Sequence, residues 1–405
     1  MKFISGGVTA AQGFTASGIH VGVKTNNPNK KDVALIVADR DCAAAALYTK
    51  NIVKAAPLLV TKRHLEGGHA RAIIANSGNA NACAPDGEEN ALRMCAAAAS
   101  ALGIPPSDVL VASTGVIGQR LKVEAIEDGI ATLAGALSPD GSDAAAGAIM
   151  TTDTVKKEVA VEFTVGGVTA KLGGIAKGSG MIHPNMGTML CFLTTDAAIS
   201  PEMIKKALLQ AVNVSFNRIS VDGDTSTNDM AVVLANGAAA NAEITSDGAD
   251  FDAFVAALTA VSVKLATEMA SDGEGAQHLI TCTVSGAATE ADAETIAKSV
   301  ISSTLFKAAI FGADANWGRA LCAMGYSGVE FDTEKVGVSF KSAAGEIAVC
   351  RDGRGLDFDE DAAKQILTEH DVVVDITISE GDASATCWGC DITYDYIKIN
   401  GDYRT

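Results

Sequence analysis

The chain contains, between residues 177 and 196, the stretch Lys177-Gly-Ser-Gly-Met-Ile-His-Pro-Asn-Met-Gly-Thr188-Met-Leu-Cys-Phe-Leu-Thr-Thr-Asp196, in which a glycine-bearing loop leads into a threonine. The apolar run Met189–Leu193 predicts a buried strand directly after that threonine. Gly187 carries no side chain that would obstruct attack on its carbonyl group. The pattern suits a chain that cleaves itself between Gly187 and Thr188, so that the Thr188 hydroxyl becomes the nucleophile of a new N-terminus.

A threonine hydroxyl is a poor nucleophile at neutral pH and needs a base. The α-amine that cleavage would free at Thr188 has a reference pKa of about 7.7–8.0, so part of it is unprotonated at neutral pH. Glycines at 178, 180 and 187 permit the strained backbone that an N-to-O acyl shift requires. Two alternatives stay open: Thr188 opens a strand because of its β-propensity, or His183 is the base.

The composition indicates a compact α/β protein with two or three cored units. The 405 residues are 48% hydrophobic and include 40 glycines, but only 5% are aromatic. The net charge of −18 argues against nucleic acid and anionic membranes as partners. The first residues lack the apolar core of a signal peptide, and we expect no apolar run long enough to span a bilayer. We therefore expect a cytoplasmic protein.

The nine cysteines favour a reducing compartment. Cys387-Trp-Gly-Cys390 is a CxxC motif, but no second CxxC or pair of clustered histidines completes a metal site, so we expect structural cysteines and no metal. Asp222–Asp229 superficially resembles a calcium loop. It lacks the terminal glutamate at the required spacing, and we do not interpret it as one.

Strand and helix patterns alternate along the chain. Proline and polar residues at Ser200-Pro201-Glu202 mark a helix start, and Gly166-Gly167 marks a hairpin turn. The predicted strands are Val33–Ala38, Ala72–Ala75, Val109–Ala112, Glu158–Val165, Val168–Leu172, Leu279–Val284 and Ile392–Ile399. The predicted helices are 86–102, 122–137, 201–212, 251–270 and 290–311.

Three further positions carry candidate chemistry. Thr114 and Gly115 end a short strand, where a hydroxyl and a backbone N–H can face the same oxyanion; the alternative is an ordinary turn. Lys177 is placed to hold a substrate carboxylate, or else is a solvated charge. Glu274 lies between two glycines and suits a substrate ammonium group, or else belongs to a surface turn.

Several blocks together resemble the ornithine acetyltransferase family of arginine biosynthesis, and they extend from near the N-terminus to the last residue. The blocks are Ala75-Asn-Ser-Gly-Asn-Ala-Asn-Ala82, Ser113-Thr-Gly-Val-Ile-Gly118, Met150-Thr-Thr-Asp-Thr154, residues 177–190, Asp272-Gly-Glu-Gly275, Asn316-Trp-Gly-Arg319 and Ile399-Asn-Gly-Asp-Tyr-Arg-Thr405. The block at residues 177–190, which contains Thr188, and the C-terminal tail are the most specific to the family.

The resemblance implies an N-terminal-nucleophile-like α/β fold with a layered α/β/β/α core, related to self-cleaving aminopeptidases. It implies cleavage into an α chain (residues 1–187) and a β chain (188–405) that stay associated, typically as an α2β2 heterotetramer. The implied reaction is ping-pong transfer of acetyl from N-acetyl-L-ornithine, through acetyl-Thr188, to L-glutamate. In bifunctional members acetyl-CoA is a second acetyl donor, and no cofactor is implied.

Carried onto this sequence, the family pattern makes Thr188 the nucleophile and Thr114 with Gly115 the oxyanion pair. The matching substrate-binding positions are Thr151, Lys177, Thr188, Glu274, Asn400 and Thr405. Thr152 and Thr154 lie in the same block as Thr151, so the choice among the three stays open.

The sequence departs from the pattern at Gly187 and Cys387, where alanine is usual. Two other functions remain: a self-cleaving aminopeptidase or amidase that passes the acyl group to water, and a binding module for an amino acid.

Overall fold

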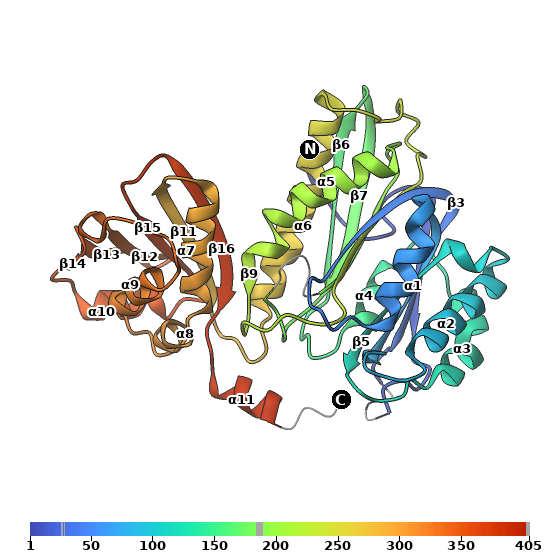
Figure 1. The fold of residues 1–405 in the computed structure, drawn as a ribbon, viewed down its shortest axis with the longest axis horizontal. Helices are drawn as coiled ribbons and strands as arrows, with labels where there is room; N and C mark the ends of the chain where they lie inside the picture. The colour runs from blue at the N-terminus through green and yellow to red at the C-terminus, as the bar shows by residue number, and fades with distance from the viewer. Residues whose placement is uncertain (26, 28, 184–188, 402–405) are drawn as a thin grey trace.

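The computed structural model describes residues 1–25, 27, 29–183 and 189–401, so the predicted cleavage pair Gly187–Thr188 and the predicted ligand Thr405 lie outside the described residues. The chain forms two lobes, each built around one sheet (Figure 1). The first lobe contains the N-terminal two thirds of the described chain. The second contains most of the C-terminal third, and helix α11 extends from it toward the first lobe (Figure 1).

The sheet of the first lobe has the order β1-β6-β7-β8-β10-β3-β4-β5, with β2 pairing β3. Strands β8 and β10 are parallel, as are β4 and β5. The strands are β1 (Lys2–Ile4), β2 (Phe14–Ile19), β3 (Val33–Tyr48), β4 (His69–Asn79), β5 (Val109–Val116), β6 (Lys157–Val165), β7 (Val168–Lys177), β8 (Leu190–Thr195) and β10 (Met230–Ala235). The helices of this lobe are α1 (Ala56–His64), α2 (Gly87–Leu102), α3 (Val123–Gly135), α4 (Ser142–Ile149), α5 (Pro201–Asn213) and α6 (Ala249–Ser271).

Strand β3 belongs to both parts of this sheet. Its first residues pair with β2 and β4, and its last residues pair with β10, with a register shift between Val37 and Cys42. Such an irregularity bends a strand. The bend lets one face of β7, β8 and β10 share a core with one face of β2, β4 and β5.

Alternation along the strands then produces four layers, because successive side chains point to opposite faces. Leu190 and Phe192 of β8 lie in the shared inner core, whereas Cys191 and Leu193 pack with α5 and α6. On the other side of the shared inner core, the outer face of β4 and β5 packs against α1 and α2, and α3 packs against β2 and β3. The predicted α/β/β/α core is therefore confirmed.

Helix α6 contradicts the expectation that no apolar run of the chain is long enough to span a bilayer. Its 23 residues are long and apolar enough to cross a membrane by length and composition. Half of the most apolar stretch is buried in the protein, however, and side chains such as Phe254, Leu258 and Leu265 pack in the outer core against β6 and β7. The helix is therefore the core helix of its layer.

The second sheet has the order β14-β13-β12-β15-β11-β16-β9. Arg218, which directly precedes β9, forms ion pairs with Glu290 and Glu294 and so links the two lobes. The strands are β9 (Ile219–Ser220), β11 (Leu279–Ala287), β12 (Gly337–Ser342), β13 (Gly345–Arg351), β14 (Arg354–Gly355), β15 (Asp371–Thr377) and β16 (Ala383–Cys390). The helices are α7 (Glu290–Ser302), α8 (Thr304–Phe311), α9 (Trp317–Gly325) and α10 (Glu360–Leu367).

The predicted elements are mostly confirmed, including the hairpin β6–β7 and the start of α5, where the Ser200 hydroxyl caps Met203 N–H. The predicted helix 290–311 is interrupted at Ser303. Its backbone is extended and its hydroxyl accepts the N–H of Phe306, so α8 starts anew there.

The prediction of a strand at Ile392–Ile399 is wrong, because this segment forms helix α11 (Tyr394–Gly401). The Thr393 hydroxyl accepts the N–H groups of Asp395 and Tyr396 and thereby starts a helix. The alternating apolar residues that indicated a strand, such as Tyr394 and Ile397, are exposed instead of facing a sheet.

The CxxC cysteines are buried and free, as predicted for structural cysteines. They lie three residues apart on strand β16, so their side chains point to opposite faces. Cys387 packs in the core of the second lobe, and Cys390 packs in the outer core of the first.

Candidate active site

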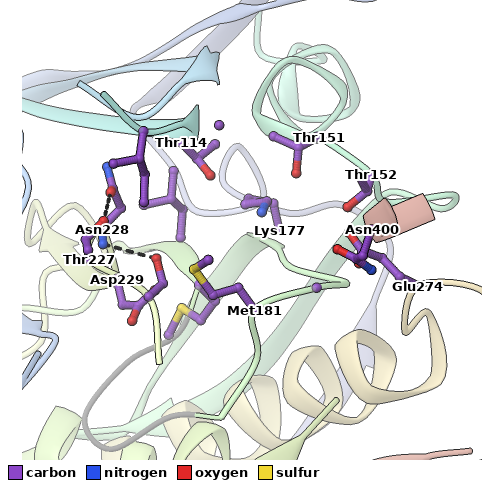
Figure 2. Close-up of a pocket in the computed structure, with 16 residues that line it drawn as sticks. Thr114, Thr151, Thr152, Lys177, Met181, Thr227, Asn228, Asp229, Glu274 and Asn400 are labelled. Atoms are coloured by element: carbon purple, nitrogen blue, oxygen red, sulfur yellow. Dashed lines mark hydrogen bonds between the residues drawn. The ribbon is translucent and has the colours of Figure 1, made fainter. Parts of the chain in front are cut away.

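A cavity of about 150 Å³ lies where several strand ends of the first lobe meet the loop after α6 and helix α11 (Figure 2). Strands β5 and β7 contribute their C-terminal ends, and the parallel strands β8 and β10 contribute the residues at their starts. The lining residues are Thr114, Gly115, Ile117, Thr151, Thr152, Lys177, Gly180, Met181, Met189, Leu190, Ser226, Thr227, Asn228, Asp229, Glu274 and Asn400. The structure therefore brings together all the predicted site residues that it describes.

Thr114 and Gly115 end β5 beside β4. Gly115 has φ +131°, and a Cβ there would lie 2.3 Å from the carbonyl carbon of Gly78 and 2.5 Å from the Asn79 nitrogen. Only glycine fits this close approach of two backbones. The local sequence thus fixes the Thr114 hydroxyl and the neighbouring backbone at the cavity wall.

Asn228 holds this wall in place from the start of β10. Its side-chain amide donates to the carbonyl oxygens of Ala80 (2.6 Å) and Ser113 (2.8 Å). The Ser113 hydroxyl in turn donates to the Asn76 side chain (2.6 Å). These hydrogen bonds are buried, so the two strand ends that flank Thr114 are rigidly connected to β10.

Lys177 ends β7 and is only 7% exposed. In the part of the chain that the structure describes, its ammonium group has no hydrogen bond or ion pair, although it lines the cavity. A buried ammonium group without a partner is unfavourable. The cavity therefore favours an anionic ligand group beside Lys177.

A buried ion-pair network lies beneath the cavity floor. The Lys157 ammonium, which is fully buried, donates to Asp153 Oδ1 (2.8 Å) and to Asp272 Oδ2 (2.6 Å). Asp153 also accepts the N–H groups of Thr151 (3.0 Å) and Gly178 (2.7 Å). Burial raises the pKa of Asp153, but the charges of Lys177 and Lys157 outweigh it and hold that pKa well below its ordinary value.

The three threonines at positions 151, 152 and 154 have different surroundings in the structure. Thr151 and Thr152 line the cavity, and the Thr152 hydroxyl is hydrogen-bonded to Ser179 (2.8 Å). Thr154 instead donates its N–H and hydroxyl to Asp272 and is not among the lining residues. Thr151 and Thr152 are therefore the two that can meet a ligand.

Glu274 follows α6 and is 7% exposed. Its Oε2 accepts the side-chain amide of Asn400 from α11 (2.7 Å), and its N–H donates to Ser179 (2.8 Å). A Cβ at Gly180 would lie 2.3–2.4 Å from the Glu274 carboxylate. The absence of a side chain at residue 180 is thus what leaves room for this carboxylate.

The sequence did not indicate Asn228 and Asp229 as site residues, because the surrounding acidic segment was weighed only as a calcium loop. A usable signal was present: polar residues 226–229 precede the apolar strand β10 as Thr188 precedes β8. Parallel strands start at the same sheet edge, so such residues lie near one another. Asp229 is fully buried, and burial raises its pKa well above the ordinary value.

His183, the alternative base, does not line the cavity among the described residues. Its Nδ1 is hydrogen-bonded to the Ser220 hydroxyl (3.0 Å). Burial and the charge of Lys298 lower its pKa to about 4, so the ring is neutral at neutral pH. Within the described ranges, no group of three or more His, Cys, Asp and Glu side chains is arranged to hold a metal ion.

The cavity wall carries a cation, Lys177, and a carboxylate, Glu274, at separate points. Figure 2 shows Thr114, Asn228 and Asp229 at one end, Glu274 and Asn400 at the other, and Lys177 between them. Met189, the residue after Thr188, lines the same cavity as Thr114 and Gly115. This arrangement suits a small ligand that carries both a carboxylate and an ammonium group.

Comparison with known proteins gives a match over nearly the whole chain. The model of the ArgJ family matches residues 15–405. The arginine biosynthesis bifunctional protein ArgJ of Symbiobacterium thermophilum is 52% identical over 406 residues, which cover 100% of both chains. A homologue in Clostridium acetobutylicum is 49% identical and covers 98% of this chain and 97% of its own. A solved structure of the Bacillus halodurans protein is 43% identical, with a TM-score of 0.50, and covers 52% of this chain and 97% of its own.

Proposed function

Because the chain belongs to the ArgJ family and is an acyltransferase of arginine biosynthesis, we propose that it transfers acetyl from N-acetyl-L-ornithine to L-glutamate. The observation that carries this proposal is the cavity that Lys177 and Glu274 share, beside the Thr114–Gly115 strand end. Both acetyl donor and acceptor are amino acids with a carboxylate, and ornithine also carries a side-chain ammonium group.

In this reaction Thr188 is the nucleophile and its α-amine is the base. Its hydroxyl attacks the acetyl carbonyl of acetylornithine, ornithine leaves as the amine, and Thr188 holds the acetyl group as an ester. Thr114 and Gly115 face the oxyanion of each tetrahedral intermediate. The α-amine of glutamate then attacks the ester, which gives N-acetylglutamate and restores the Thr188 hydroxyl.

The remaining residues bind the amino acids. Lys177 holds a ligand carboxylate, and Glu274 holds the ornithine ammonium group. Asn400 and Thr405 from the C-terminal tail, together with Thr151, complete the binding set. Such separate sites for opposite charges orient the acetyl group toward one point of the cavity.

The proposal includes maturation by self-cleavage between Gly187 and Thr188. The α chain (1–187) and the β chain (188–405) then remain together, as an α2β2 assembly in the cytoplasm. Strand β7 of the first chain lies between β6 and β8, and β8 belongs to the second chain, so the two chains share one sheet and one core. We also propose acetyl-CoA as a second acetyl donor, without any cofactor.

Mass spectrometry under denaturing conditions tests the proposal. Wild-type protein and Thr188→Ala are incubated with acetylornithine or with acetyl-CoA. We expect a wild-type β chain that begins at Thr188 and gains one acetyl group from each donor, and an uncleaved variant that gains none. A wild-type chain that stays whole would contradict the central claim.

A second measurement separates transfer from hydrolysis. With acetylornithine and glutamate present, we expect N-acetylglutamate to accumulate faster than free acetate. Acetate as the main product would instead favour an amidase that passes the acyl group to water.

A further inference from the structure

A buried pair, His278 and Asp391, connects the loop that carries Glu274 to the second lobe, and the reaction described above does not use it. His278 ends the loop 272–278 between α6 and β11, and Asp391 directly follows β16. Both residues are buried, and neither is among the described residues that line the cavity. Any effect of the pair on a ligand must therefore pass through other residues.

The Asp391 carboxylate accepts hydrogen bonds from both the backbone and a side chain of the loop. Its Oδ1 accepts the N–H groups of Gln277 (2.9 Å) and His278 (3.1 Å), and its Oδ2 accepts Nδ1–H of His278 (2.8 Å). A carboxylate only accepts hydrogen bonds, so this contact places an imidazole proton on Nδ1. Hydrogen bonds to a buried charged group are strong, and they hold the end of the loop in one position.

The residues after Asp391 extend this connection into helix α11. The Thr393 hydroxyl donates to the Gly275 carbonyl (2.7 Å). Gly275 has φ +69°, and a Cβ there would lie 2.7 Å from the backbone nitrogen of Tyr396 in the first turn of α11. The loop and the helix are therefore in direct backbone contact, which only glycine permits at residue 275.

The same connection determines where two cavity residues lie. Glu274 belongs to the loop, Asn400 belongs to α11, and Asn400 Nδ2 donates to Glu274 Oε2 (2.7 Å) at one end of the cavity (Figure 2). Asp391 is thus hydrogen-bonded to the loop that carries Glu274 and is followed in the chain by the helix that carries Asn400. A shift at Asp391 would move both residues.

Lys177 does not depend on this connection. It ends β7, a central strand of the first sheet, and its position is fixed by the pairing of β7 with β6 and β8. The two charged residues of the cavity are therefore held independently, Lys177 by the first sheet and Glu274 by a loop that Asp391 anchors. The distance between the two charges depends on how firmly that loop is held.

We propose that the hydrogen bond between His278 and Asp391 positions Glu274 and thereby sets the length of the amino-acid side chain that the enzyme accepts. This role rests on the proposed function, in which Lys177 holds the ligand carboxylate and Glu274 holds the ornithine ammonium group. Two charges at a fixed separation select a ligand whose own charges have the matching separation. His278 and Asp391 are positioning residues, because they act through Glu274.

Substrates that differ by one methylene group report on this separation. Nα-acetyl-lysine is one methylene group longer than acetylornithine, so its ammonium group overshoots a fixed Glu274 unless the chain bends. The hydrogen bond between the two charged groups is then lost or distorted, and the longer substrate is disfavoured. A loop that is free to move follows the longer ligand and discriminates less.

The test removes the donor at residue 278 and then restores it. His278→Leu removes Nδ1–H, whereas His278→Asn places an amide N–H near the same point. We expect H278L to raise the KM for acetylornithine about tenfold, the effect of a weakened hydrogen bond to a charged group, with little change in the KM for glutamate. We expect H278N to restore the wild-type constants. The half-reactions are measured separately.

His370→Leu is the matched control. His370 Nδ1 and Asp371 Oδ1 form the same kind of contact (2.7 Å), but both side chains are exposed. We expect wild-type constants for H370L. Partial unfolding of H278L would lower kcat but not change KM, because KM does not depend on how much enzyme is folded. An unchanged KM for acetylornithine in H278L, or no recovery in H278N, would overturn the proposed role.

The selectivity between substrates gives a second readout. The ratio of kcat/KM for acetylornithine to that for Nα-acetyl-lysine is expected to fall about tenfold in H278L, within the range that one methylene group supplies. The ratio is expected to stay at the wild-type value in H278N and H370L. Asp391→Asn, which weakens the same hydrogen bonds from the other side, is expected to lower the ratio as well. An unchanged ratio in folded H278L and D391N would contradict the assignment.

A double-mutant cycle shows whether the pair acts through Glu274. In an E274Q background H278L is expected to add little to the loss for acetylornithine, because both substitutions weaken the same interaction. Fully additive losses would overturn the assignment, since the pair would then act by another route. The proposed function fails by a different result, which is a wild type that does not transfer acetyl from acetylornithine to glutamate.

Discussion

Single residues set the shape of the cavity as much by what they lack as by what they carry. Gly115 permits the contact between β4 and β5, and Gly180 leaves space for the Glu274 carboxylate. Lys177 and Glu274 are both nearly buried at the cavity wall, where the low dielectric strengthens their attraction to ligand charges. Substitutions at these positions therefore report directly on ligand binding.

Gly180→Ala is expected to reduce kcat/KM for acetyl transfer by about 100-fold, which is the effect of a 1 Å misplacement of a binding group. The added Cβ would lie 2.3 Å from the Glu274 carboxylate carbon and must displace it. Steady-state kinetics check this. Gly147→Ala is the matched control, because its Cβ on α4 would meet only the Lys156 side chain at 3.6 Å. Unchanged kinetics of G180A would show that Glu274 does not need its present position.

Glu274→Gln is expected to raise the KM for acetylornithine more than the KM for glutamate. Hydrogen bonds to charged groups contribute about 1.5–3 kcal/mol, so a loss of about tenfold or more is expected on the ornithine side. The two half-reactions, measured separately, give both constants. Equal losses for both substrates would refute the assignment of Glu274 to the ammonium group. Self-cleavage of this variant is expected to stay normal.

At the scale of elements, the Lys157 network joins the segments that form the cavity floor. Lys157 begins β6, Asp153 precedes that strand, and Asp272 follows α6. Through Asp153 the network holds the backbone N–H groups of Thr151 and Gly178. The positions of Thr151 and Lys177 thus depend on the buried charge of Lys157, which does not itself contact a ligand.

Lys157→Met is expected to lower the free energy of unfolding by about 3–5 kcal/mol, because it leaves two buried carboxylates without their shared cation. Urea denaturation measures the change. Lys156→Met is the control from the adjacent residue: its ion pair with Asp143 is exposed, so a loss of at most about 1 kcal/mol is expected. Equal losses for the two variants would contradict a special role of Lys157.

Asp153 also makes stability depend on pH. Burial raises its pKa, but Lys177 and Lys157 lower it further, so the folded pKa lies below the unfolded value of about 3.9. Its stabilising contribution is therefore complete above that value and is lost as the pH falls toward the folded pKa. We expect the unfolding free energy to fall in acid below about pH 4, with a smaller slope in Asp153→Asn. An unchanged slope in D153N would exclude Asp153 as a source of the acid sensitivity.

At the scale of the whole molecule, the site is completed from the second lobe. Helix α11 follows β16, crosses toward the first lobe and places Asn400 against Glu274 (Figure 1). The helix buries none of its residues, so its position serves the cavity more than the core. The Thr393 hydroxyl, which donates to the Gly275 carbonyl (2.7 Å), connects the start of α11 to the Glu274 loop.

Removal of residues 394–405 is expected to abolish acetyl transfer while the fold and self-cleavage persist. The deletion removes Asn400 and Thr405 but no buried side chain of α11. Thermal unfolding, a denaturing gel and the transfer assay check the three parts in one preparation. Full activity of the truncated protein, or loss of its fold, would contradict this reading of the tail.

Much of the molecule is predictable from the sequence because the local signals are strong. The apolar run Met189–Leu193 places strand β8, and the Ser200-Pro201-Glu202 signature places the start of α5. The tail was assigned wrongly because Ile392–Ile399 alternates like a strand, whereas the Thr393 cap starts a helix there. Asn228 and Asp229 were missed because the polar residues before β10 become informative only once the fold shows that β10 lies parallel beside β8.

By itself, the sequence determined the α/β class and, through its motif blocks, the family, which in turn implied the layered core. It also supplied the residue types for a charged amino-acid ligand, because these depend on chemistry carried by each residue. Only the tertiary structure decided that Lys177, Glu274 and Asn400 line one cavity, that Thr154 turns away to Asp272, and that Asp229 is buried with one carboxyl oxygen that has no hydrogen-bond partner among the described residues. These facts depend on strand order and burial, which arise from contacts between residues far apart in the chain.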